Sequence, residues 1–200
     1  DTEIPSELAT KIGGSYEDQK DMFGDLIMLL IMIIILVYIV MASQFESFMS
    51  PFVIMFSIPF AFVGVLLGLW VTGTPLGTMG MIGILILMGI VVKNGIVLID
   101  YTILMRERGK SVAEASVIAA KSRLRPILMT TLTTVLGMIP MAIGQGEGAE
   151  MWRSLGMVVA WGLSISTLVT LVIIPTVYAS MASWQERRAA RKAAKKLAKA

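Results

Sequence analysis

Long apolar stretches alternate with short polar connections along the chain. A helix that crosses a bilayer needs about 17 to 25 mostly apolar residues. Five stretches meet this requirement, at about 26–42, 51–71, 76–101, 126–144 and 154–178. Every backbone polar group inside hydrocarbon must be satisfied within its own element, so the stretches are predicted to be helices rather than strands. The predicted fold is all-α, a polytopic transmembrane helical bundle with five membrane spans.

The connection between the third and fourth spans has a helical pattern of its own. Ser111 and Glu114 have the spacing of a capping box. Apolar residues then recur on one face, at Val112, Ala115, Ile118 and Ala119. This pattern predicts a short interfacial helix over about 111–120 that lies on the membrane surface. We expect it to stop before Pro126, which would open the fourth span because the first turn of a helix tolerates a missing N–H.

Prolines and glycines mark further features of the predicted spans. Three prolines lie inside spans, at Pro59, Pro140 and Pro175. Each removes one helical hydrogen bond and is predicted to kink its helix, with a tolerated bend of no functional meaning as the alternative. The turn 72–75 separates the second span from the third. Gly64 and Gly68 form a GxxxG pattern, which predicts close helix packing.

Basic residues predict the orientation of the bundle, because positive charge marks the cytoplasmic side of a membrane protein. The connection between spans three and four and the C-terminal tail carry thirteen of them: Arg106, Arg108, Lys110, Lys121, Arg123, Arg125, Arg187, Arg188, Arg191, Lys192, Lys195, Lys196 and Lys199. Five spans place both regions on one side. The other side holds the acidic N-terminal segment and a loop with Glu147 and Glu150. We expect the N-terminus outside and the C-terminus in the cytoplasm.

Composition excludes several classes of function. Hydrophobic residues make up 56% of the chain and charged residues 16%, whereas a soluble domain carries about 25% charged residues. Cysteine and histidine are absent, which excludes disulfides, cysteine metal sites and a histidine proton shuttle. The sequence has no nucleophile–base pair, metal cluster or phosphate loop, so we expect neither an enzyme nor a bound cofactor. The basic tail favours anionic lipid over nucleic acid, since it follows a span directly and has little aromatic interleaving.

Lys93 is the main candidate for chemistry. It lies inside the third span, in GIVVKNGIVLIDY, and a charge at that depth costs a few kcal/mol unless it faces water or a partner. The alternative is a snorkelling lysine, although about eight residues, near 12 Å, separate it from the cytoplasmic end of the span. The charge of a lysine responds to burial and to a nearby carboxylate, which suits proton-coupled work.

Polar neighbours of Lys93 are weaker candidates on spacing alone. Asn94 can act in the site or join helices. Asp100 lies two turns from Lys93 and near the interface, where it can pair with Arg106 or close the site. Arg123 has the position of an interface anchor. The fourth span adds Thr130, Thr131, Thr133 and Thr134, which either form a polar face toward a wet cavity or bond back to their own helix.

Several motifs in order resemble the resistance-nodulation-division pumps, most closely their hydrophobe and amphiphile efflux branch. They are FGDL, LVYIVMASQFESFMSPFVIMFSIPFAFVGVLLGL, MGIVVKNGIVLIDY and RLRPILMTTLTTVLGMIPMAIG, within about residues 16–178. The resemblance implies the last five of twelve spans in a bacterial inner-membrane homotrimer. Such a pump exports drugs, detergents or dyes in exchange for protons, and docks to an adaptor protein and an outer-membrane channel. Residues 1–24 would end a periplasmic domain, 25–183 form the transmembrane domain, and 184–200 form a basic cytoplasmic tail.

The resemblance also assigns a proton relay in part. The family's lysine matches Lys93, its arginine matches Arg123 in RLRP, and its threonine matches Thr130. Asn94 follows as the neighbour of the lysine, and Asp100 and Thr131 are secondary candidates. The family's aspartate pair belongs to the N-terminal half, which this chain lacks, so we expect that half as a partner and the proton motive force as the energy source.

Two alternatives stay open at this point. The chain can be an excised, designed or split-gene membrane module that assembles but does not transport by itself. It can also belong to the heavy-metal branch of the same family, although the KNG motif and the absence of histidine and cysteine count against that branch.

Overall fold

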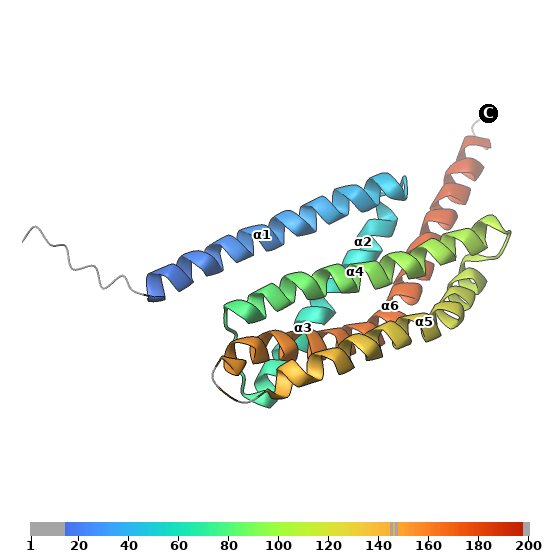
Figure 1. The fold of residues 1–200 in the computed structure, drawn as a ribbon. Coiled ribbons are helices and arrows are strands. Elements are labelled where there is room, and N and C mark those ends of the chain that lie inside the picture. The colour runs from blue at the N-terminus through green and yellow to red at the C-terminus, as the bar shows by residue number, and fades with distance from the viewer. Residues whose placement is uncertain (1–14, 145, 147, 198–200) are drawn as a thin grey trace, which may run out of the picture.

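The structure, a computed structural model, describes residues 15–144, 146 and 148–197. These residues form helices throughout, with no strand among them (Figure 1): α1 (Ser15–Gln44), α2 (Met49–Met55), α3 (Ile58–Thr72), α4 (Thr78–Glu107), α5 (Val112–Ile143) and α6 (Ala149–Leu197). Five segments of this part are long and apolar enough to cross a membrane, with α2 and α3 together making the second. The predicted class, an all-α bundle with five spans, is confirmed. Residues 1–14, Glu147 and Lys199, which entered the sequence predictions, lie outside the described residues.

The second span breaks where its proline predicts a disturbance. Helix α2 ends at Met55 and α3 starts at Ile58, with Pro59 in the first turn of α3. The ring of Pro59 has no N–H to donate to the carbonyl one turn earlier, so the helix cannot continue through this point undisturbed. The hydroxyl of the buried Ser57 donates to the Ile54 carbonyl oxygen at 2.6 Å, which satisfies a carbonyl next to the break.

Helix α5 corrects the prediction of a separate interfacial helix. Ser111 caps it as predicted, since the Glu114 N–H donates to the Ser111 hydroxyl and the Ser111 N–H donates to the Glu114 carboxylate. However, the helix does not stop before Pro126 and continues as one element to Ile143. One face of its first turns, which includes Ala115 and Ala119, is buried against the bundle. Packing of that face therefore contributes more to the stability of the continuous helix than the one hydrogen bond that Pro126 removes.

Helix α6 is the element on which the others pack. It contacts α3, α4 and α5 extensively and continues without interruption past the predicted end of the fifth span into the basic tail. Fully buried side chains such as Leu98, Leu163 and Ile174 fill the space between α4 and α6. Helix α1 differs, because it lies at the edge of the bundle (Figure 1) and touches mainly α2 and α4. Most of its large apolar side chains are exposed. In a spanning helix these side chains face lipid or further helices.

Small residues set the distance between α6 and its neighbours. A Cβ added to Gly64 of α3 would lie 3.1 Å from the Gly162 Cα of α6, and one added to Gly68 would collide with the Trp161 side chain. The GxxxG pattern therefore marks a close helix contact, as predicted. On the other side of α6, a Cβ at Gly156 would lie 2.8 Å from the backbone nitrogen of Ala142 in α5.

The contact at Gly156 leads to a test of the packing. Because backbone atoms cannot turn aside as a flexible side chain can, we expect Gly156→Ala to lower the free energy of unfolding by about 1–3 kcal/mol. Denaturant titration of the reconstituted chain, followed by helical circular dichroism, measures this change. The matched control is Gly137→Ala in α5, which has open space around its added methyl group and should be neutral or stabilising by up to about 1 kcal/mol. Equal stability of the two variants would contradict the close contact.

Candidate functional site

Lys93 lies on the outer face of α4, beside α1. Its side chain lines a hollow of about 330 Å³ between the two helices, together with apolar residues such as Val37 and Val40 of α1 and Ile96 of α4. The side chain is exposed, and it makes no hydrogen bond or ion pair with any described residue. A cation in the middle of a spanning helix is costly unless a counter-charge or water reaches it. The open face beside Lys93 is therefore where such a partner would have to come from.

Asp100 does not provide that partner. Its side chain is exposed and, within the described part of the chain, bonds to neither Lys93 nor Arg106. Arg106 instead donates from its guanidinium to the hydroxyl of the buried Tyr178 on α6, at 3.2 Å. This contact fastens the end of α4 to α6, so the pairing of Asp100 with Arg106 that the sequence left open is not formed.

Arg123 projects from α5 toward the end of α4. Its guanidinium carbon lies 4.8 Å from the centre of the Tyr101 ring, which is a cation–π contact. Its Nε–H is buried and has no hydrogen-bond partner among the described residues. A buried donor without a partner is rare in proteins. Arg123 is therefore held by a ring while part of its hydrogen-bonding capacity is unused.

The threonines of α5 divide into two groups. The Thr130 hydroxyl donates to carbonyl oxygens of its own helix, at 2.9 Å from Ile127 and 3.2 Å from Pro126. Thr133 and Thr134 bond back in the same way. Thr131 is different, because it is buried and its hydroxyl lies 3.1 Å from the Thr167 hydroxyl of α6. Back-bonding thus accounts for three of the four, and only Thr131 joins two helices.

Helix α6 contributes polar residues that the sequence reasoning missed. Besides Thr167, the hydroxyl of Thr170 is buried and has no hydrogen-bond partner in the described part of the chain. A signal was present, since Ser166, Thr167 and Thr170 lie close together within a mostly apolar span. Hydroxyls at helical spacing inside a span indicate a polar seam between helices.

The structure does not join the four predicted relay residues to one another. Lys93 and Asn94 point to different sides of α4, because consecutive helical residues are about 100° apart; Lys93 is exposed whereas Asn94 is 9% exposed. Arg123 and Thr130 are seven residues apart and so share one face of α5. No hydrogen bond or ion pair links any two of these residues in the described part of the chain. The site is two open faces, on α4 and α5, rather than a closed cluster.

A bundle of spanning helices, with a cation inside one span that has no partner among the described residues, is typical of a membrane transporter. The profile of the AcrB/AcrD/AcrF family matches residues 1–182. The chain therefore belongs to this family of resistance-nodulation-division transporters and corresponds to part of their membrane domain.

The names of curated relatives of the chain refer to swarming motility, metal resistance and multidrug resistance. It is 45% identical over 136 residues to the swarming motility protein SwrC of Bacillus subtilis strain 168, with 68% of this chain and 13% of that protein covered. It is 43% identical over 122 residues to the cobalt-zinc-cadmium resistance protein CzcA of Cupriavidus metallidurans, with 61% and 12% covered. It is 42% identical over 135 residues to the multidrug resistance protein MdtC of Erwinia tasmaniensis, with 67% and 13% covered. The chain thus spans about an eighth of the length of these relatives.

A solved structure gives the same assignment. The crystal structure of a heavy metal efflux pump superposes with a TM-score of 0.76 at 32% sequence identity. The match covers 85% of this chain and 17% of that one. Relatives with drug-related and metal-related names both match, so the prediction of the hydrophobe and amphiphile branch is not confirmed.

The Thr131–Thr167 contact can be measured by a double-mutant cycle. We expect Thr131→Val and Thr167→Val to be coupled by about 0.6 kcal/mol in the free energy of unfolding, a typical value for hydroxyl pairs between membrane helices. Denaturant unfolding of the two single variants and the double variant gives the coupling energy. Replacing Thr133 by Val serves as the control, because that hydroxyl bonds only to its own helix, and its effect should add to that of Thr167→Val. A coupling energy of zero for the first pair would contradict the interhelical bond.

Proposed function

We propose that the chain forms part of the proton-translocating membrane domain of an exporter driven by the proton motive force. The observation that carries the proposal is Lys93, a cation in the middle of a span that has no partner among the described residues and lies on an open face of α4. Arg123 and Thr130, which match the relay of the resembling pumps, share one face of the neighbouring helix α5. Since the chain spans about an eighth of its curated relatives, the activity belongs to the whole pump.

The mechanism assigns a separate role to each of these residues. Carboxylates from helices outside this chain would sit against Lys93 and hold its ammonium group while they are ionised. Protonation of the carboxylates removes the attraction, so Lys93 turns away and α4 shifts relative to those helices. Protonation of the carboxylates would thus move α4 from one of two arrangements to the other, which is how an electrostatic switch acts. Thr130 and Arg123 would supply a hydroxyl and a guanidinium N–H from one face of the neighbouring helix α5, and Asn94 would act beside Lys93 on α4.

The substrate class we propose is drugs and other amphiphiles. The chain resembles the amphiphile branch in its KNG motif, and MdtC carries a multidrug resistance name. A second candidate is a metal cation, which the similarity to CzcA and to the heavy metal efflux pump favours. Loss of resistance to ethidium or to zinc, on deleting the gene that encodes the chain, distinguishes the two classes.

The proposed setting is the bacterial inner membrane, within a homotrimeric pump that contacts an adaptor protein and an outer-membrane channel. The N-terminus of the chain would be periplasmic and the C-terminus cytoplasmic. An alternative is a module that assembles in the membrane but does not transport by itself. Co-expression with the rest of the pump separates the two, because only a functional part restores export.

The orientation can be tested by labelling single cysteines from each side of the membrane. The chain has no native cysteine, so no background reaction is expected. Glu150→Cys, at the start of α6, should react with an impermeant maleimide added outside inner-membrane spheroplasts. Arg187→Cys, near the other end of α6, should react only after the membrane is opened. Labelling of both positions from the same side would contradict the orientation.

Lys93→Met tests the relay. In the isolated chain the change removes an unpaired cation from a lipid-facing surface, so it should raise resistance to denaturant in lipid nanodiscs. In the complete pump the same change should abolish proton-coupled export at normal expression, because no ammonium is left to respond to the carboxylates. Unfolding of the reconstituted chain and dye efflux from cells measure the two effects.

Matched variants separate the relay from general effects. Lys110→Met removes a lysine outside the spans and should leave export unchanged. Thr130→Ala should lower export, whereas Thr133→Ala should not, although both hydroxyls bond back to their own helix. Export that survives Lys93→Met would leave Lys93 as a snorkelling lysine. Destabilisation of the isolated chain by Lys93→Met would instead reveal a partner within the chain.

A further inference from the structure

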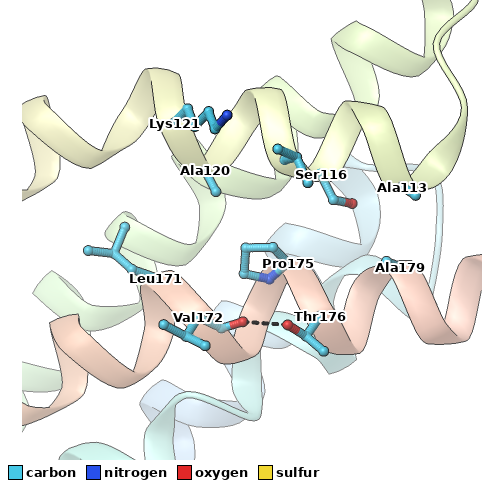
Figure 2. A pocket seen from close by; sticks show the side chains of 10 residues that line it. Ala113, Ser116, Ala120, Lys121, Leu171, Val172, Pro175, Thr176 and Ala179 are labelled. Atoms are coloured by element: carbon cyan, nitrogen blue, oxygen red, sulfur yellow. Dashed lines mark hydrogen bonds between the residues drawn. The ribbon is translucent and has the colours of Figure 1, made fainter.

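The seam between α5 and α6 is hollowed on its outer side, near the connection between α4 and α5. A hollow of about 490 Å³ lies between residues 113–121 of α5 and residues 171–179 of α6 (Figure 2). Short side chains open it, notably Ala113, Ala120 and Ala179. Its two hydroxyls are satisfied internally, since Ser116 donates to the Val112 carbonyl and Thr176 to the Val172 carbonyl. The wall of this hollow is therefore largely apolar.

A second hollow follows along the same seam, farther from the α4–α5 connection. It measures about 180 Å³ and is lined by Leu128, Leu132 and Leu168 among others. Leu168, in the second hollow, is 63% exposed, and Val172, in the first, is 68% exposed. The seam thus presents an uncovered apolar strip that runs from the end of the bundle toward its middle.

Charge on α5 divides this strip into two parts. Lys121, Arg125, Leu128 and Leu132 follow at intervals of four, three and four residues, which places them on one edge of the helix. Both cations are exposed, and neither bonds to another described residue. Lys121 lines the first hollow, whereas the leucines line the second. The order along the edge is therefore two cations and then two exposed leucines.

The depth of the two cations follows from their neighbour. Arg123 lies between them in the sequence and stacks on Tyr101. Tyrosine rings are enriched at the boundary between hydrocarbon and headgroups, and arginine and lysine side chains keep their charged ends at that boundary. With the Tyr101 ring at that boundary, Lys121 and Arg125 would lie at headgroup level and Leu128 and Leu132 in the hydrocarbon.

We propose that the α5–α6 seam binds one anionic phospholipid of the adjacent leaflet. The phosphate lies between Lys121 and Arg125, beside the first hollow, and one acyl chain lies along Leu128, Leu132 and Leu168. Charge complementarity selects an anionic headgroup, because basic pockets between membrane helices bind such lipids. A partner helix would have no need for the observed order of cations followed by leucines, whereas a lipid has its charge at one end and its apolar chain at the other.

Native mass spectrometry of the full chain, with defined lipids added, tests the site. The probes are dioleoyl phosphatidylglycerol and, as the uncharged comparison, dioleoyl phosphatidylcholine. We expect one retained phosphatidylglycerol and no retained phosphatidylcholine. The double change Lys121→Gln and Arg125→Gln should weaken phosphatidylglycerol binding about 30-fold, because each cation near an anionic group contributes roughly a fivefold factor. Ala120→Trp keeps both cations but fills the first hollow, and it should also lower retention.

The control pair is Arg108→Gln with Lys110→Gln, which removes two charges from the same connection but away from the seam. It should retain the lipid, and circular dichroism should show that all variants keep their helices. Equal loss in the control pair would reduce the effect to general surface charge and overturn the site. Retention by the Lys121 and Arg125 double variant, or equal retention of phosphatidylcholine, would also overturn it. If Ala120→Trp keeps the lipid but weakens co-purification with the rest of the pump, the hollow is a protein contact instead.

Discussion

Close approach of helices to α6 is the constraint on which the rest of the structure depends. Glycines on both sides make this approach feasible, because Gly64 and Gly68 of α3 and Gly156 of α6 lie where a methyl group would meet a neighbouring helix. Lipid gives no hydrophobic driving force between spanning helices, so their association depends on such packing and on a few interhelical hydrogen bonds. Thr131 with Thr167 and Arg106 with Tyr178 add two bonds of this kind, both ending on α6.

Packing around α6 leaves the opposite sides of α4 and α5 open, and Lys93 and Thr130 lie there. Lys93 is on the exposed side of α4, and the hollow beside it is bordered by the loosely attached α1. Arg123 reaches the end of α4 but keeps an N–H that has no partner among the described residues. Buried or membrane-embedded polar groups without partners are costly. These faces are therefore where helices of a longer pump, or water between them, would satisfy the remaining groups.

Much of the architecture could be predicted from local patterns. Hydrophobic length alone gave five spans, and the capping box at Ser111 and Glu114 marked the start of α5 correctly. The predicted end of this helix before Pro126 was wrong. Helices tend to stop before a proline, but here burial of the face that includes Ala115 and Ala119 competes with that tendency. Pro59 acted as expected and split the second span, whereas Pro126, Pro140 and Pro175 lie inside continuous helices.

The sequence by itself determined the class of fold, the family and the residue types that carry charge inside the spans, since hydropathy and motifs depend only on local order along the chain. The tertiary structure decided which of those residues meet. It left Lys93 on an open side of α4 with no partner among the described residues, and it paired Thr131 with Thr167, which lies 36 residues away. The spacing of residues along the sequence determines on which face of a helix a side chain lies. Which residue it contacts on another helix depends on how the helices pack, and packing is a property of the whole bundle.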